Sequence, residues 1–99
     1  MAERVVERTL SDGGLSIHYR LERLGGDLLL TVTGGAAHVG CVVLATHRQS
    51  LTGSGADSAD SSVLNRSGHK DEFLLRALAE RLSAVAGCAV AAVGGVPYD

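Results

Sequence analysis

The sequence predicts an α+β domain: an antiparallel β-meander, one long amphipathic helix packed on the sheet, and a closing C-terminal strand. Three observations lead to this prediction. Residues 15–24 alternate apolar and polar side chains, which is the period of a strand with one buried face. Residues 69–86 carry apolar side chains at helical spacing. A short apolar run follows the helix directly and is typical of a buried strand.

The first two strands are predicted on either side of the turn Ser11-Asp12-Gly13-Gly14. Residues 4–10 alternate well enough for the first strand. Residues 15–24 form the second, with apolar side chains at the odd positions from Leu15 to Leu21 and polar ones between them.

The next turn, Gly25-Gly26, permits the positive φ angles of a two-residue hairpin. Pairing across this turn sets Leu21 opposite Leu30 and Tyr19 opposite Val32. The apolar faces of the two strands then coincide, which supports a hairpin in this register.

After a second break at Gly34-Gly35, residues 36–47 predict another strand. Its run 41–45 is apolar at every position, which indicates burial on both faces. Residues 48–60 are rich in Ser, Gly and Asp and show no periodicity, so we expect a loop here, either a mobile lid or a disordered segment. Residues 61–64 predict a short edge strand.

The predicted helix runs from His69 to Ala86. Ser67 or Asn65 is available to cap its start, and Gly87 is a natural left-handed stop. Residues 88–96 then predict a closely packed last strand. The apolar stripe of the helix comprises Leu74, Leu78, Leu82 and Val85, widened by Leu75 and Ala79.

The chain of 99 residues is predicted to form a single domain, residues 1–99. It has 9 Lys and Arg against 11 Asp and Glu, with no basic stripe, which argues against nucleic-acid binding. Its charged N-terminus predicts neither a signal peptide nor a membrane span. Cys41 and Cys88 lie in apolar runs without CxxC spacing, which indicates reduced thiols and a cytoplasmic location. Because so small a core is thin, we expect a homodimer.

Few residues are candidates for catalysis or metal binding. The four histidines show no HxH or HxxxH spacing, so no metal site is predicted. Apolar neighbours disfavour the thiolate of Cys41 as a nucleophile. The pair Gly34-Gly35 lacks both phosphate-loop patterns and predicts a turn. We therefore assign no catalytic residue and expect a binding protein rather than an enzyme.

The start of the predicted helix, Gly68-His69-Lys70, is the strongest candidate for a binding site. The helix dipole favours acidic residues there, which Asp71 satisfies and Lys70 does not. Free helix-initial amides, a lysine ammonium and a histidine N–H would suit a phosphate monoester or a carboxylate. The alternative is a solvent-facing first turn in which Lys70 only offsets Asp71.

Three stretches of the chain, residues 34–45, 61–87 and 88–99, together resemble the LpdD-like domain. This domain is the prenylated-flavin chaperone, or D-subunit, of gallate- and vanillate-type decarboxylase systems. The resemblance covers roughly residues 15–99. More distantly, the order of elements is similar to that of small proteasome assembly chaperones, which are dimeric α+β proteins.

Short motifs carry this resemblance. An AHIG-type strand and a GHKE/D-type helix start read here as Ala37-His38-Val39-Gly40 and Gly68-His69-Lys70-Asp71. The closing GIHxD-like segment reads Gly95-Val96-Pro97-Tyr98-Asp99 and lacks the family's usual histidine. The family often continues into a further helix, whereas this sequence stops after the closing segment.

The resemblance implies an accessory protein that binds prenylated FMN or FMN and delivers it to a partner decarboxylase subunit acting on hydroxybenzoate-type acids. The cofactor-binding residues would be Gly68, His69, Lys70 and His38, with the first three forming a cationic, amide-lined seat for the flavin phosphate. The alternative is a protein-interaction or assembly chaperone with no small-molecule ligand. An isolated decarboxylase is the third and least favoured hypothesis.

Overall fold

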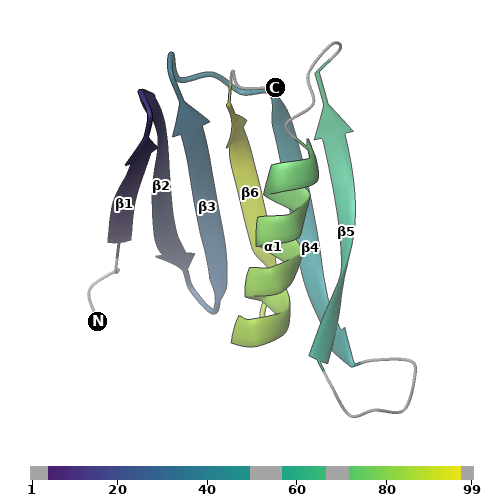
Figure 1. The fold of residues 1–99 in the computed structure, drawn as a ribbon. Coiled ribbons are helices and arrows are strands. Elements are labelled where there is room, and N and C mark those ends of the chain that lie inside the picture. Colours follow the sequence, from purple (N-terminus) through teal and green to yellow (C-terminus); the bar gives the residue numbers. More distant parts are fainter. Residues whose placement is uncertain (1–4, 50–56, 67–71, 97–99) are drawn as a thin grey trace.

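The computed structural model describes residues 5–49, 57–66 and 72–96 (Figure 1). These residues form one six-stranded sheet with a helix on one face, so the predicted α+β class is confirmed. The helix has 15 residues and is short rather than long. The elements in chain order are β1 (Val5–Asp12), β2 (Leu15–Leu24), β3 (Asp27–Gly34), β4 (Cys41–Gln49), β5 (Asp57–Asn65), α1 (Glu72–Ala86) and β6 (Val90–Gly95).

The first three strands form the predicted antiparallel meander. The second strand has the predicted bounds, and the predicted hairpin register is confirmed, with Leu21 opposite Leu30 and Tyr19 opposite Val32. Gly25 takes the positive φ of 58° that the tight turn requires. Alternation and a glycine pair were therefore sufficient to define this half of the sheet.

The predicted simple meander is wrong for the rest of the sheet. The strand order is β1-β2-β3-β6-β4-β5, so the closing strand lies in the middle, parallel to β3 and antiparallel to β4. Because β5 and β6 both run antiparallel to β4, they are parallel to each other, and α1 makes the crossover that parallel strands require. The Val, Ala and Gly side chains of β6 suit this central position because they allow close packing on both sides.

The predicted loop over residues 48–60 is wrong at both of its ends. β4 continues to Gln49 and β5 begins at Asp57, so only residues 50–56 lie outside the described part. Arg48 donates from Nε to Oδ1 of Asp60 at 2.8 Å across this pair. Ladder pairing thus overrides the low strand propensity of Asp and Ser. The edge position predicted for the strand is confirmed.

Most of the predicted helix stripe packs on the sheet, since Leu74, Leu78 and Leu82 are partly buried against the core, but Val85 does not and Ser83 joins it instead. Leu75, Ala79 and Ser83 of α1 are fully buried, while Val85 is 74% exposed. Ser83 satisfies its buried hydroxyl by donating to the carbonyl oxygen of Cys88 at 2.6 Å. The core on this face also contains Leu30, Val32, Cys41, Val43, Ala45, Val90 and Ala92.

The two strands predicted to be buried on both faces are covered by α1 on one face only. Val43 of β4 is buried beneath α1, but Leu44, which points to the opposite face, is 50% exposed. Cys41 is buried and Cys88 half-buried, and the two form no disulfide with each other. No described element therefore covers the second face of the central strands.

Candidate functional site

The predicted site residue His38 lies in the loop between β3 and β4. This loop stands at the edge of the sheet where β3 and β6 end and β4 begins, which we name the loop edge. His38 is half-buried, and its Nδ1 lies 2.9 Å from the carbonyl oxygen of Ala36. Gly40 anchors the loop because its N–H donates to the carbonyl oxygen of Gly94 at 2.8 Å.

The three other predicted site residues, 68–70, lie outside the described residues. The residues that flank this stretch are placed at the loop edge. Asn65 donates from Nδ2 to Oε1 of Glu72 at 2.9 Å, so the two flanks are bonded to each other. The N–H of Arg66 donates to the carbonyl oxygen of Gly40 at 2.8 Å. The chain therefore enters and leaves the predicted binding segment beside the loop that carries the fourth predicted residue.

Arg66 adds a cation to the loop edge and was not predicted from the sequence. Its NH1 donates to the carbonyl oxygen of Val39 at 3.0 Å, which holds the guanidinium beside the same loop. A guanidinium matches the geometry of a phosphate with two parallel donors. The signal was present in the sequence, since Arg66 stands two residues before Gly68.

The described histidines, cysteines and acidic residues do not form a metal site. Within residues 5–49, 57–66 and 72–96, no three His, Cys, Asp or Glu side chains come close enough to share a metal ion. The imidazole of His18 instead bonds Oγ1 of Thr9 at 2.8 Å, across β1 and β2. At the loop edge, the guanidinium of Arg66 has further N–H groups beyond the one bonded to Val39, and these suit binding of an anion.

A second feature, not predicted from the sequence, is an apolar trough on the face that carries α1. The helix packs on β6, β4 and β5, and it leaves β1, β2 and much of β3 uncovered (Figure 1). We name this hollow the helix-side trough; its volume is about 360 Å³. Its apolar lining includes Val6 and Leu10 of β1, Tyr19 and Leu21 of β2, and Leu78 and Leu82 of α1.

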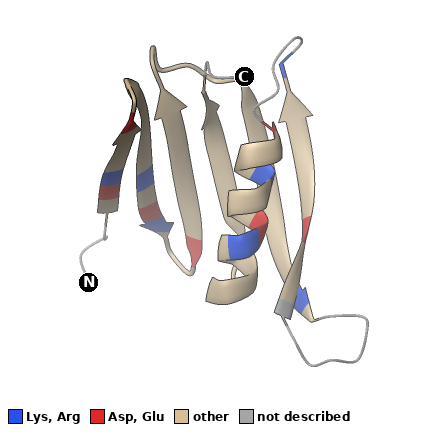
Figure 2. Ribbon diagram, viewed as in Figure 1, with Lys and Arg blue, Asp and Glu red and all other residues tan. Residues whose placement is uncertain are grey.

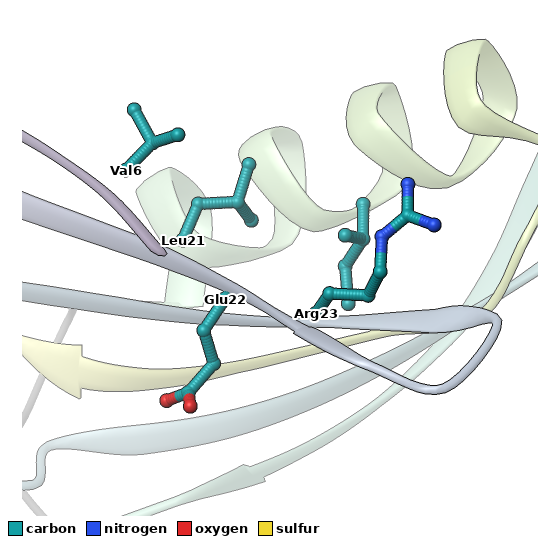
Figure 3. A pocket seen from close by; sticks show the side chains of 5 residues that line it. Val6, Leu21, Glu22 and Arg23 are labelled. Carbon is teal, nitrogen blue, oxygen red and sulfur yellow. The ribbon is translucent and has the colours of Figure 1, made fainter. Parts of the chain in front are cut away.

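The trough continues towards the β2–β3 turn as a smaller hollow of about 170 Å³. Figure 3 shows Val6, Leu21 and Arg23 projecting to the side of the sheet on which α1 lies, and Glu22 projecting to the other side. Arg8 also lines the trough. Figure 2 shows the charged positions on β1, β2 and α1, whereas β6 carries none. The trough thus combines an apolar lining with arginines from β1 and β2.

The family model of the prenylated flavin chaperone LpdD-like domain matches residues 11–99. The chain belongs to this family. The match includes β2 to β6, α1 and the loop edge, but it leaves out residues 5–10 of β1. The two motifs that carried the resemblance in sequence, at residues 37–40 and 68–71, both fall within the matched part of this LpdD-like chain. No curated protein matches the sequence.

The fold of the LpdD-like chain is similar to that of a chain in the crystal structure of a novel chaperone complex for yeast 20S proteasome assembly. The TM-score is 0.61 at 14% identity, and the alignment covers 100% of this chain and 80% of that one. The distant similarity expected from the order of elements is therefore confirmed at the level of the fold. The helix that the structure describes is not long and apolar enough to cross a membrane.

Proposed function

We propose that this protein is a non-enzymatic, cytoplasmic accessory factor for a decarboxylase. It binds prenylated FMN, or FMN itself, and delivers the cofactor to a decarboxylase of hydroxybenzoate-type acids. The observation that supports this proposal is the match to the prenylated flavin chaperone family over residues 11–99. That match includes the loop edge, where the guanidinium of Arg66 suits an anionic group.

In this proposal the flavin phosphate binds at Gly68, His69 and Lys70, with His38 beside it. Helix-initial amides and an ammonium group attract a phosphate through hydrogen bonds and charge. Two contacts support the location: the bond between the side chains that flank this segment, and the bond from Arg66 to the His38 loop. The apolar ring system would then lie against the neighbouring protein surface.

His69→Ala is expected to weaken flavin binding more at pH 6 than at pH 8. The imidazolium form, which is populated at the lower pH, is the better partner for a phosphate. Titrations of FMN into both proteins at the two pH values measure this difference. An equal loss of affinity at both pH values would show that the charge of His69 plays no part in binding.

We further propose that the protein is a homodimer that uses the sheet face opposite α1. This face carries Leu44 and Leu64, which are 50% and 75% exposed, with the half-buried Val42 beside Leu64. Burying such a patch against a second copy would complete the cover of the central strands. Leu44→Glu is expected to shift the protein to monomers because it places a charge in the apolar interface.

Light scattering at micromolar concentration measures this shift. Leu10→Glu is the matched control, since Leu10 is 63% exposed but lies on the face that carries α1, so this variant should remain dimeric. A wild-type protein that is strictly monomeric would contradict the proposal.

The alternative function is that of an assembly chaperone that binds only protein. This alternative is suggested by the similarity in fold to a chain of a proteasome assembly chaperone complex. Purification from the native host separates the two functions, with bound flavin scored by its visible absorbance and partner polypeptides by mass spectrometry. Flavin together with a decarboxylase subunit supports the proposal, whereas a co-purified partner without any flavin supports the alternative.

A further inference from the structure

The first half of the sheet presents an apolar surface that no described part of the chain covers. In β1 and β2 the side chains on the face of α1 are mostly apolar, whereas those on the opposite face are mostly polar. Val6 and Leu10 remain 46% and 63% exposed on the apolar side. This alternation is the pattern of strands whose apolar face packs against another element.

The helix presents its own apolar side to the same space. Leu78 and Leu82 line the trough, although the helix packs on the sheet mainly through Leu75 and Ala79. Val85, one turn after Leu82 on the same side of the helix, is 74% exposed. Leu78 and Leu82 therefore contact the core and also form a wall of the trough.

The dimensions of this surface suit a second helix. β2 has ten residues, which gives the floor a length of roughly 33 Å at the rise of a strand. The outer strands β1 and β3 lie two strand spacings apart, or roughly 10 Å, which is about the diameter of a helix with its side chains. A helix laid here would run beside α1 at an ordinary packing distance.

The charges around the trough indicate which charge its occupant should carry. Arg8 lines the trough and Arg23 lines its continuation, whereas Glu22 beside Arg23 projects to the other side of the sheet (Figure 3). On the opposite face, Arg20 is paired with Glu7 and Glu22 at 3.2 and 2.7 Å, so its charge is balanced there. The chain carries a net charge of −2, yet Arg8 and Arg23 place two positive charges along the trough.

We propose that the helix-side trough is a docking groove for an amphipathic helix with acidic flanks, contributed by a partner polypeptide. Its leucine stripe would fill the apolar lining, and its Glu or Asp residues would face Arg8 and Arg23. Two copies of this chain docked trough to trough would bring their arginines together, so charge disfavours self-association here. Binding of a partner helix would be a function beyond flavin binding. Part of the groove is formed by residues 5–10, which lie outside the family match.

Two fluorescent peptides test this groove on the complete chain. Each is a helix-forming peptide of about 18 residues with one leucine stripe; one has glutamates beside the stripe and the other has lysines. The glutamate peptide is expected to bind saturably, and the lysine peptide roughly ten-fold more weakly, because about two exposed ion pairs are exchanged for repulsions. Arg8→Glu combined with Arg23→Glu should reverse this preference while leaving the apolar lining in place.

Matched variants locate the binding on the molecule. Leu10→Gln should weaken the glutamate peptide at least roughly five-fold, since it places a polar group in the apolar contact. Val5→Gln, on the same strand but on the opposite face, should leave the affinity unchanged, since Val5 is 45% exposed and does not line the trough. Melting curves of both variants confirm that they fold.

Several results would overturn the inference. These are equal affinity for the two peptides, no saturable binding of either, an unaffected Leu10→Gln variant, or displacement of the peptide by FMN. The last result would assign the trough to the cofactor instead. FMN affinity of the Leu10→Gln variant is measured separately, so loss of the groove and loss of the flavin site are distinguishable.

Discussion

Gly94→Ala is expected to lower the free energy of unfolding by about 2–6 kcal/mol, a large part of the stability of a small domain. Gly94 is buried in the central strand β6 and has a φ of +148°, which side chains other than that of glycine rarely allow. A Cβ at this position would overlap the carbonyl oxygen of Val32 on β3. Strain and overpacking therefore act together, and the strands would have to separate to accept a methyl group.

Urea denaturation of the wild type and the variant measures this loss. Gly26→Ala is the matched control, because it adds the same methyl group at a position with open space and without a positive φ. It should change stability by less than about 1 kcal/mol. Unfolding of the two variants at the same urea concentration would contradict the close approach of Gly94 in β6 to Val32 in β3.

Lys70→Ala is expected to weaken FMN binding roughly ten- to a hundred-fold, because a charge-assisted hydrogen bond typically contributes about 1.5–3 kcal/mol. Stability should hold or rise by about 0.3–1 kcal/mol, since a cation is unfavourable at the positive end of a helix dipole. Quenching of flavin fluorescence measures the affinity, and melting curves measure the stability. The other hypothesis, a solvated first turn, predicts unchanged affinity and some loss of stability.

A matched control for this variant lies on the same helix. Arg76→Ala also removes one positive charge, but Arg76 lies beside Glu72 and Glu80 at 3.9 and 4.0 Å on the side of α1 towards β5. Its FMN affinity should remain that of the wild type. Lys70 is also the only lysine in the chain, so FMN should protect it from amine-reactive labels. Labelling that FMN does not slow would count against the phosphate site.

The sequence predicted those parts of the fold that depend on local pattern. Alternation over residues 15–24 and the pair Gly25-Gly26 were sufficient for the bounds and register of the β2–β3 hairpin. The central position of β6 could not be predicted in this way, because the order of strands depends on which elements pack together after the crossover. β5 was missed in part because its polar residues gain their strand conformation from pairing with β4.

Of the two candidate sites, the sequence pointed to the loop edge but not to the helix-side trough. The motifs around His38 and residues 68–70 pointed to the loop edge, where the described flanking residues Arg66 and Glu72 are placed. The helix-side trough was not predicted, since its lining comes from strands in the first third of the chain and from the helix near its end. The stripe containing Leu78 and Leu82 gave the only signal, and it was interpreted as packing on the sheet.

The central claim is that this protein binds a flavin cofactor without itself catalysing a reaction. Calorimetric titration of prenylated FMN into the purified chain under anoxic conditions, with FMN titrated alongside, tests it most directly. The account predicts saturable binding with one flavin per chain, weakened in Lys70→Ala and unchanged in Arg76→Ala. The absence of saturable heat with either flavin, from a protein that melts cooperatively, would contradict it.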